Sequence, residues 1–132
     1  MRRIISKTML SFAALAFMAF TTSPTKAADA VKGAKVYKKC VSCHMVGDKA
    51  KNRVGPQLNG IIGRDIASLD DYKYSKAMVK YAEAEKVWSE ENLSAYLANP
   101  RKTVKGTRMA FAGLRKQADV DNVIAYLKEN AK

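Results

Sequence analysis

The residues with the most specific chemistry stand together as Cys40-Val41-Ser42-Cys43-His44. Two thiols three positions apart, followed at once by an imidazole, form the C-x-x-C-H signature of covalent c-type haem attachment. The thiols can reach neighbouring vinyl groups of one porphyrin, and the imidazole beneath the ring can bind iron. Cys40 and Cys43 are the only cysteines, and His44 is the only histidine. The pentapeptide therefore predicts a covalently bound haem.

Other interpretations of this pentapeptide are weaker. A closed zinc site needs four ligands, and the chain has only three cysteine and histidine residues in all. A thioredoxin-like redox pair would stand beside a βαβ pattern, and the sequence has no run of alternating β-branched strands. A structural disulfide stays possible in an oxidising compartment, although it gives the histidine no role.

The N-terminal region predicts export. A basic opening is followed by an apolar run over residues 9–20 and by small residues around Ala27 and Ala28. This order is typical of a secretory signal peptide, and the apolar run is too short for a permanent membrane span. We expect residues 1–27 to be cleaved, leaving the domain 28–132 in the periplasm. Cleavage after Ala30 also fits the small-x-small rule, and retention of the leader as an anchor is the alternative.

The mature chain is small and basic. Removing residues 1–27 from 132 leaves 105 residues, enough for one domain, and lowers the formal net charge from +12 to +8. A positive balance favours an anionic partner such as an acidic protein face or a membrane surface. Export argues against nucleic acid. A domain of this size has a modest core, so a buried porphyrin would supply much of its apolar interior.

The apolar periodicity predicts an all-α fold. Asp29 is a candidate N-cap of a first helix that carries Val36 and Cys40, and the last helix runs from about Gln117 to the end. We expect these two helices to pack together, with Gly33 allowing a close approach. Between them, helical residues dominate 70–86, Ser89 caps another helix that Pro100 ends, and residues 45–65 form an irregular segment around the cofactor edge.

The second axial position of the iron has three candidates after leader removal: Met45, Met78 and Met109. Met45 adjoins His44 and cannot cross the ring. Met78 occupies a helical face, where a core methionine is the ordinary expectation. Met109 follows a glycine-containing loop that could lay a thioether against a metal, but spacing alone leaves core packing equally possible.

The motifs in order resemble those of class I c-type cytochromes of the mitochondrial and bacterial periplasmic kind. They cover essentially all of residues 29–132 and read C-V-S-C-H, V-G-P-Q-L-N-G-I-I-G-R, Y-K-Y-S, V-W-S, Y-L-A-N-P-R-K and K-G-T-R-M-A-F. The chain departs from the family pattern at Lys105, where proline is common, and at Met78, where asparagine is common. The spacing between Ala77 and Trp88 is also a few residues longer.

The resemblance implies which residues bind the cofactor. It implies one haem c per chain, held by thioethers at Cys40 and Cys43, with His44 and Met109 as axial ligands of the iron. It further implies a carbonyl at Pro56 that orients His44 and a set of residues around the haem. Arg64, Tyr74 and Trp88 match positions that bond a buried propionate, and Tyr96 and Thr107 match groups that tune the methionine side. The implied fold is four to five helices wrapped around the haem.

The expected function is electron transfer by a soluble, single-haem, monomeric protein that cycles between Fe(III) and Fe(II). Basic residues near the motif and near Met109, such as Lys39 and Lys102, would guide docking to acidic faces of redox proteins. A quinol–cytochrome c oxidoreductase complex and a terminal oxidase or reaction centre are the expected partners. The alternative is a peroxidase-like enzyme or gas sensor, which needs an open iron face and usually a distal acid–base residue.

Overall fold

Short capped helices and long irregular segments make up the part of the chain that the computed structural model describes, residues 27–131. The predicted leader lies outside these residues up to Lys26. The helices of the described part are α1 (Ala30–Tyr37), α2 (Lys76–Ala84), α3 (Glu90–Ala98), α4 (Pro100–Thr103) and α5 (Gln117–Asn130). Within the same residues, β structure is limited to an isolated antiparallel bridge between Asp65 and Val87. The predicted all-α fold is confirmed.

Side-chain caps begin four of these helices. Asp29, Ser75, Ser89 and Asn99 each accept a hydrogen bond from the backbone N–H three residues further on, at 3.0 to 3.1 Å. Such caps satisfy the free N–H groups of a first helical turn. The predicted caps at Asp29 and Ser89 are therefore confirmed.

Two predicted helix boundaries were wrong. The first helix ends at Tyr37, before Cys40. Residues 70–75 are irregular because Ser75 caps α2 in an extended conformation. Pro100 ends α3 as predicted, and it also begins α4, since its missing N–H is no loss in a first helical turn.

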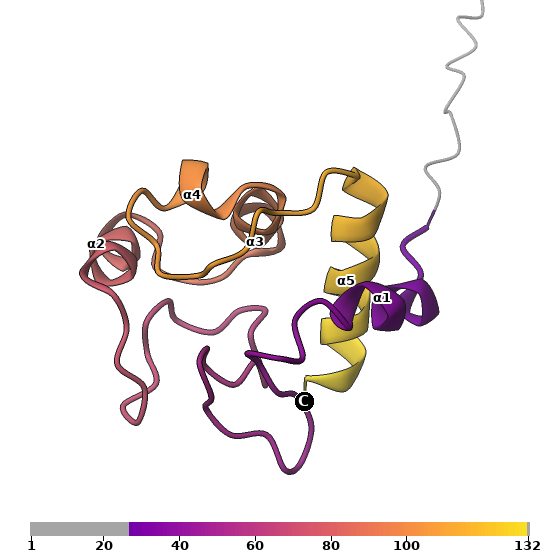
Figure 1. Cartoon of the computed structure of the whole chain (residues 1–132), viewed down its shortest axis with the longest axis horizontal. Helices are drawn as coiled ribbons and strands as arrows, with labels where there is room; N and C mark the ends of the chain where they lie inside the picture. The colour runs from indigo at the N-terminus through magenta and orange to yellow at the C-terminus, as the bar shows by residue number, and fades with distance from the viewer. Residues whose placement is uncertain (1–26, 132) are drawn as a thin grey trace, which may run out of the picture.

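The crossing of α1 and α5 forms the main helix–helix contact (Figure 1). Val36 of α1 and Val120, Val123 and Leu127 of α5 are buried in the shared core. A side chain at Gly33 would overlap the carbonyl oxygen of Asn122, so only glycine permits this approach. The predicted pairing of the two terminal helices is confirmed.

The remaining helices lie to one side of the pair formed by α1 and α5 (Figure 1). Figure 1 shows α2 on the side opposite α5, with α3 and α4 between them and the irregular segment that follows α1 running beneath. None of the helices among residues 27–131 has the length and apolar character that crossing a membrane requires.

Candidate functional site

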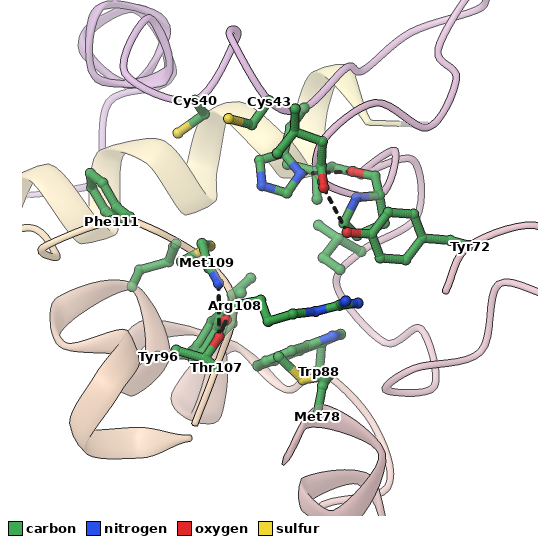
Figure 2. A pocket seen from close by; sticks show the side chains of 18 of the residues that line it. Cys40, Cys43, Tyr72, Met78, Trp88, Tyr96, Thr107, Arg108, Met109 and Phe111 are labelled. Atoms are coloured by element: carbon green, nitrogen blue, oxygen red, sulfur yellow. Dashed lines mark hydrogen bonds between the residues drawn. The ribbon is translucent and has the colours of Figure 1, made fainter. Parts of the chain in front are cut away.

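A cavity of about 620 Å³ lies between the irregular segment, α3, α5 and the loop after α4. Apolar and aromatic side chains provide most of its lining. The side chains with metal or thiol chemistry in its walls are Cys40, Cys43, His44, Met78 and Met109. Figure 2 shows the two cysteines together at one end of the pocket, with Met109, Thr107 and Tyr96 across from them. A volume of this size is typical of small-molecule and cofactor sites.

Consecutive turns carry the C-x-x-C-H residues into the cavity. Beyond α1, the N–H of Cys40 donates to the carbonyl of Tyr37 at 2.8 Å, and the N–H of His44 donates to the carbonyl of Cys40 at 2.9 Å. The hydroxyl of Tyr37 also donates to the His44 carbonyl, at 3.3 Å. Both cysteines are free thiols, so the disulfide considered from the sequence is absent. The turns place two thiols and the imidazole in the walls of the same cavity.

His44 is held in one orientation by its neighbours. Its Nδ1 lies 2.7 Å from the carbonyl oxygen of Pro56, a partner that can only accept, so Nδ1 carries the proton and Nε2 is left unprotonated. A Cβ at Gly55 would overlap the imidazole, which shows how closely the backbone packs against the ring. Burial lowers the pKa of His44, and the nearby Arg64 charge acts in the same direction. A neutral imidazole with a free Nε2 is the form that binds metals.

Two hydroxyl groups support the part of the cavity wall that contains Met109. The Tyr96 hydroxyl lies 2.8 Å from Thr107 Oγ1, and the N–H of Met109 donates to the same Thr107 oxygen at 3.3 Å. Burial raises the pKa of Tyr96, which keeps its phenol neutral. The predicted residues Tyr96 and Thr107 therefore adjoin Met109.

Two methionines line the cavity, and they differ in setting. Met78 belongs to α2 and is buried in the core, while the half-buried Met109 belongs to the irregular loop after α4. Met45 is not part of the cavity wall. The structure therefore keeps Met78 and Met109 as thioethers within the site.

The polar part of the cavity contains Arg64, Tyr74 and Trp88. The Arg64 guanidinium donates to the carbonyls of Asn59 and Gln57 at 2.9 and 3.0 Å. The ion pairs found among residues 27–131, Lys32–Asp29 and Lys128–Glu90, leave this guanidinium without a carboxylate. Burial lowers the pKa of Arg64 and raises that of Tyr74. A half-buried cation without an anionic partner suits a ligand that carries a negative group.

Exposed cations surround the cavity mouth, and sequence reasoning found only some of them. Lys39, Lys73 and Arg108 line the cavity, whereas Lys102, expected there from the sequence, is not part of its wall, and Lys73 was not among the expected cations. Gly55 and Tyr72 were also missed as site residues. Both stand inside motifs already noted, G-P and Y-K-Y-S, but their roles depend on contacts between segments distant in sequence.

Comparisons with known proteins agree with this geometry. The family model described as "Cytochrome c" matches residues 30–131. A "Cytochrome c2" of Afifella marina is 53% identical over 96 residues, covering 73% of this chain and 77% of the relative. A "Cytochrome c-550" of Ancylobacter novellus is 50% identical over 97 residues, covering 74% and 91%.

A solved structure shares the fold as well. Cytochrome cH from Methylobacterium extorquens superposes with a TM-score of 0.69 at 38% identity, covering 76% of this chain and 98% of that one.

Proposed function

Because the chain belongs to the cytochrome c family and is an electron-transfer protein with haem c bound through its cysteine pair, we propose that His44 and Met109 are the axial ligands. The bound haem supplies one iron that cycles between Fe(III) and Fe(II). His44, Met109 and both thiols line one cavity, and Met109 is favoured over Met78 because it lies in the loop supported by the Tyr96–Thr107 pair, whereas Met78 is buried in the core. The chain is accordingly an electron carrier and not an enzyme.

The protein's own groups then have separate roles. Cys40 and Cys43 tether the cofactor, and the Pro56 carbonyl holds His44 with Nε2 available. The Tyr96–Thr107 pair fixes the backbone beside Met109. Histidine–methionine ligation raises the reduction potential. Because the same two side chains serve both oxidation states, little has to rearrange when an electron moves.

Arg64, Tyr74 and Trp88 are proposed to hold a haem propionate. The Arg64 guanidinium, which has no carboxylate partner among residues 27–131, offers a positive charge, and the Tyr74 phenol remains a hydrogen-bond donor because burial raises its pKa. Together they would offset the cost of burying a carboxylate.

The choice between the two methionines is tested by substitution in the haem-loaded protein. Met109→Ala should abolish the weak far-red sulfur-to-iron absorption band of the ferric form, while the haem stays attached. Met78→Ala, the matched control, should leave the band in place. Loss of the band in Met78→Ala with retention in Met109→Ala would reverse the assignment.

We further propose that acidic faces of redox proteins dock at the cavity mouth, among them a quinol–cytochrome c oxidoreductase complex and a terminal oxidase or reaction centre. Lys39, Lys73 and Arg108 come from three segments and line the same mouth. Exposed charges are screened beyond about 8 Å at physiological ionic strength, so electron transfer should slow as salt rises.

Charge neutralisation tests this docking face. Lys39→Gln or Lys73→Gln should lower the association rate and its salt dependence in stopped-flow kinetics. Lys128→Gln is the control, because Lys128 pairs with Glu90 on the face of α3 and α5. Equal effects at all three lysines would mean that net charge alone matters.

The leader over residues 1–27 supports a periplasmic location after export and cleavage. N-terminal sequencing of the purified protein should find Ala28 as the first residue. A chain that begins at Met1 would instead indicate a membrane-anchored form.

A further inference from the structure

Three hydrogen bonds tie the irregular segment Asp71–Lys73, here called the strap, to two opposite walls of the cavity. The Tyr72 hydroxyl donates to the carbonyl of Val54 at 2.8 Å (Figure 2), and Asn52 Nδ2 donates to the carbonyl of Asp71 at 3.3 Å. From the other side, Arg108 Nη2 donates to the carbonyl of Lys73 at 2.6 Å. The strap therefore links segments 18 and 35 residues away from it in sequence.

Both anchor points adjoin residues that position the candidate axial ligands. Val54 precedes Gly55, which packs against the His44 ring, and Pro56, which accepts the Nδ1 hydrogen bond. Arg108 directly precedes Met109. Tyr72, Val54 and Arg108 all line the cavity. The strap thus connects the cavity wall beside His44 (residues 54–56, the histidine wall) to the wall beside Met109 (residues 107–109, the methionine wall). It includes neither ligand.

The loop that carries Met109 has few other fixed points. Its backbone hydrogen bonds among the described residues are Thr107 N–H to the Val104 carbonyl and Leu114 N–H to the Leu97 carbonyl. Thr107 Oγ1 adds the contact to the Met109 N–H at 3.3 Å. Segments with few such bonds open locally at low free energy. A single further hydrogen bond at Arg108 can therefore change how often this loop opens.

We propose that the strap restrains the release of Met109 from the iron by coupling the two walls, with Tyr72 and Arg108 as positioning residues. The proposal rests on Met109 being the axial ligand proposed above. Tyr72 belongs to the strap, and its hydroxyl bonds to Val54 on the His44 side of the cavity rather than to the loop that carries Met109. Its hydroxyl nevertheless acts on Met109 through Lys73 and Arg108.

The test measures the affinity of imidazole for the ferric haem-loaded protein. Loss of the far-red sulfur-to-iron band reports the binding. Tyr72→Phe and Arg108→Gln should each raise the imidazole affinity about threefold to tenfold, the effect of about one lost hydrogen bond. In the double variant the imidazole affinity should rise by less than the product of the two single increases, because either change frees the same strap. Arg108→Lys keeps a charged donor on a longer side chain than glutamine and should fall between wild type and Arg108→Gln.

Two matched controls separate the strap from general loosening. Tyr126→Phe removes a hydroxyl beside Tyr37, and Arg115→Gln removes an exposed charge after the loop. Neither should change the imidazole affinity. An effect of Arg108→Gln with none of Tyr72→Phe, or equal effects in the controls, would overturn the coupling while leaving Met109 as the ligand. A wild-type protein without the far-red band would overturn the Met109 assignment, and the role of the strap with it.

Discussion

At the scale of single residues, Gly55 packs directly against the ring of the candidate ligand His44. A Cβ at this position would stand 2.7 Å from both ring nitrogens, and the Pro56 hydrogen bond prevents the ring from turning away. Gly55→Ala should therefore lower the free energy of unfolding of the ferric protein by about 1–3 kcal/mol. Denaturant titration with a simultaneous visible spectrum would measure it.

The neighbouring Val54→Ala is the matched control for this substitution. Val54 is 79% exposed, and its bond to Tyr72 uses only the carbonyl, so stability should change by less than about 0.5 kcal/mol. If Gly55→Ala proved equally neutral, the close packing against the imidazole would not matter for stability.

The Tyr37 phenol should make the free energy of unfolding depend on pH in the alkaline range. Burial raises its pKa to about 12 from an ordinary value near 10, so the unfolded chain loses this proton first. The contribution of the protonated Tyr37 phenol to the free energy of unfolding is complete below about pH 10 and is lost as the pH rises toward 12. Tyr37→Phe should flatten that decline, as measured by unfolding at several pH values between 9 and 12. An unchanged slope would show that other tyrosines set the alkaline limit.

At the scale of elements, the crossing of α1 and α5 depends on Gly33. The space for a side chain is filled by the Asn122 carbonyl and by the Tyr126 Cβ, which would lie 2.7 Å from an added Cβ. Helix backbones cannot yield easily, so Gly33→Ala should cost about 3 kcal/mol of unfolding free energy despite alanine's higher helix propensity.

Thermal unfolding would measure that loss, with Lys35→Ala as the control. Lys35 is exposed on the same helix, so its replacement should change stability by less than about 0.5 kcal/mol. A Gly33→Ala protein as stable as the control would mean that the two helices can separate without loss.

Local sequence signals predicted the elements well where capping and periodicity agreed. Asp29, Ser89 and the apolar stripe of α5 gave three helix positions correctly. The helix predicted over 70–86 begins only at Lys76, because the Tyr72 hydroxyl bonds to the distant Val54 carbonyl and Ser75 caps α2, although residues that favour helices dominate the whole stretch. Such competition between propensity and a long-range contact cannot be read from the local sequence.

At the scale of the whole molecule, the cavity passes through the core. Val123, Leu127 and Leu93 belong both to the buried cluster and to the cavity wall. Replacing Cys40 and Cys43 together by alanine should prevent covalent attachment and leave a largely unfolded chain, because an empty space of about 620 Å³ cannot stay open within so small a core. Far-UV circular dichroism would detect the loss of helix. A native-like spectrum would show that the protein folds without its cofactor.

The candidate site was predictable to the extent that its chemistry is local. The C-x-x-C-H residues are neighbours in sequence, and the backbone turns bring them to one place. The methionine was different, because both Met78 and Met109 line the cavity and the sequence supplies no distance between them and His44. The strap could not be predicted either, since its contacts join residues 52–54, 71–73 and 108 only after folding.

Asp29 connects the maturation of the chain with its folding. Its side chain caps α1 through the Lys32 N–H, and its own N–H donates to Asn122 Oδ1 at 2.8 Å, 93 residues away. The proposed leader has two candidate cleavage points, after Ala27 and after Ala30, and only the first would leave Asp29 in the protein. A cut after Ala30 would remove the cap of α1 and the hydrogen bond from Asp29 to Asn122 of α5. If the proposed leader is removed, the cleavage point would therefore also decide how firmly the first helix is held.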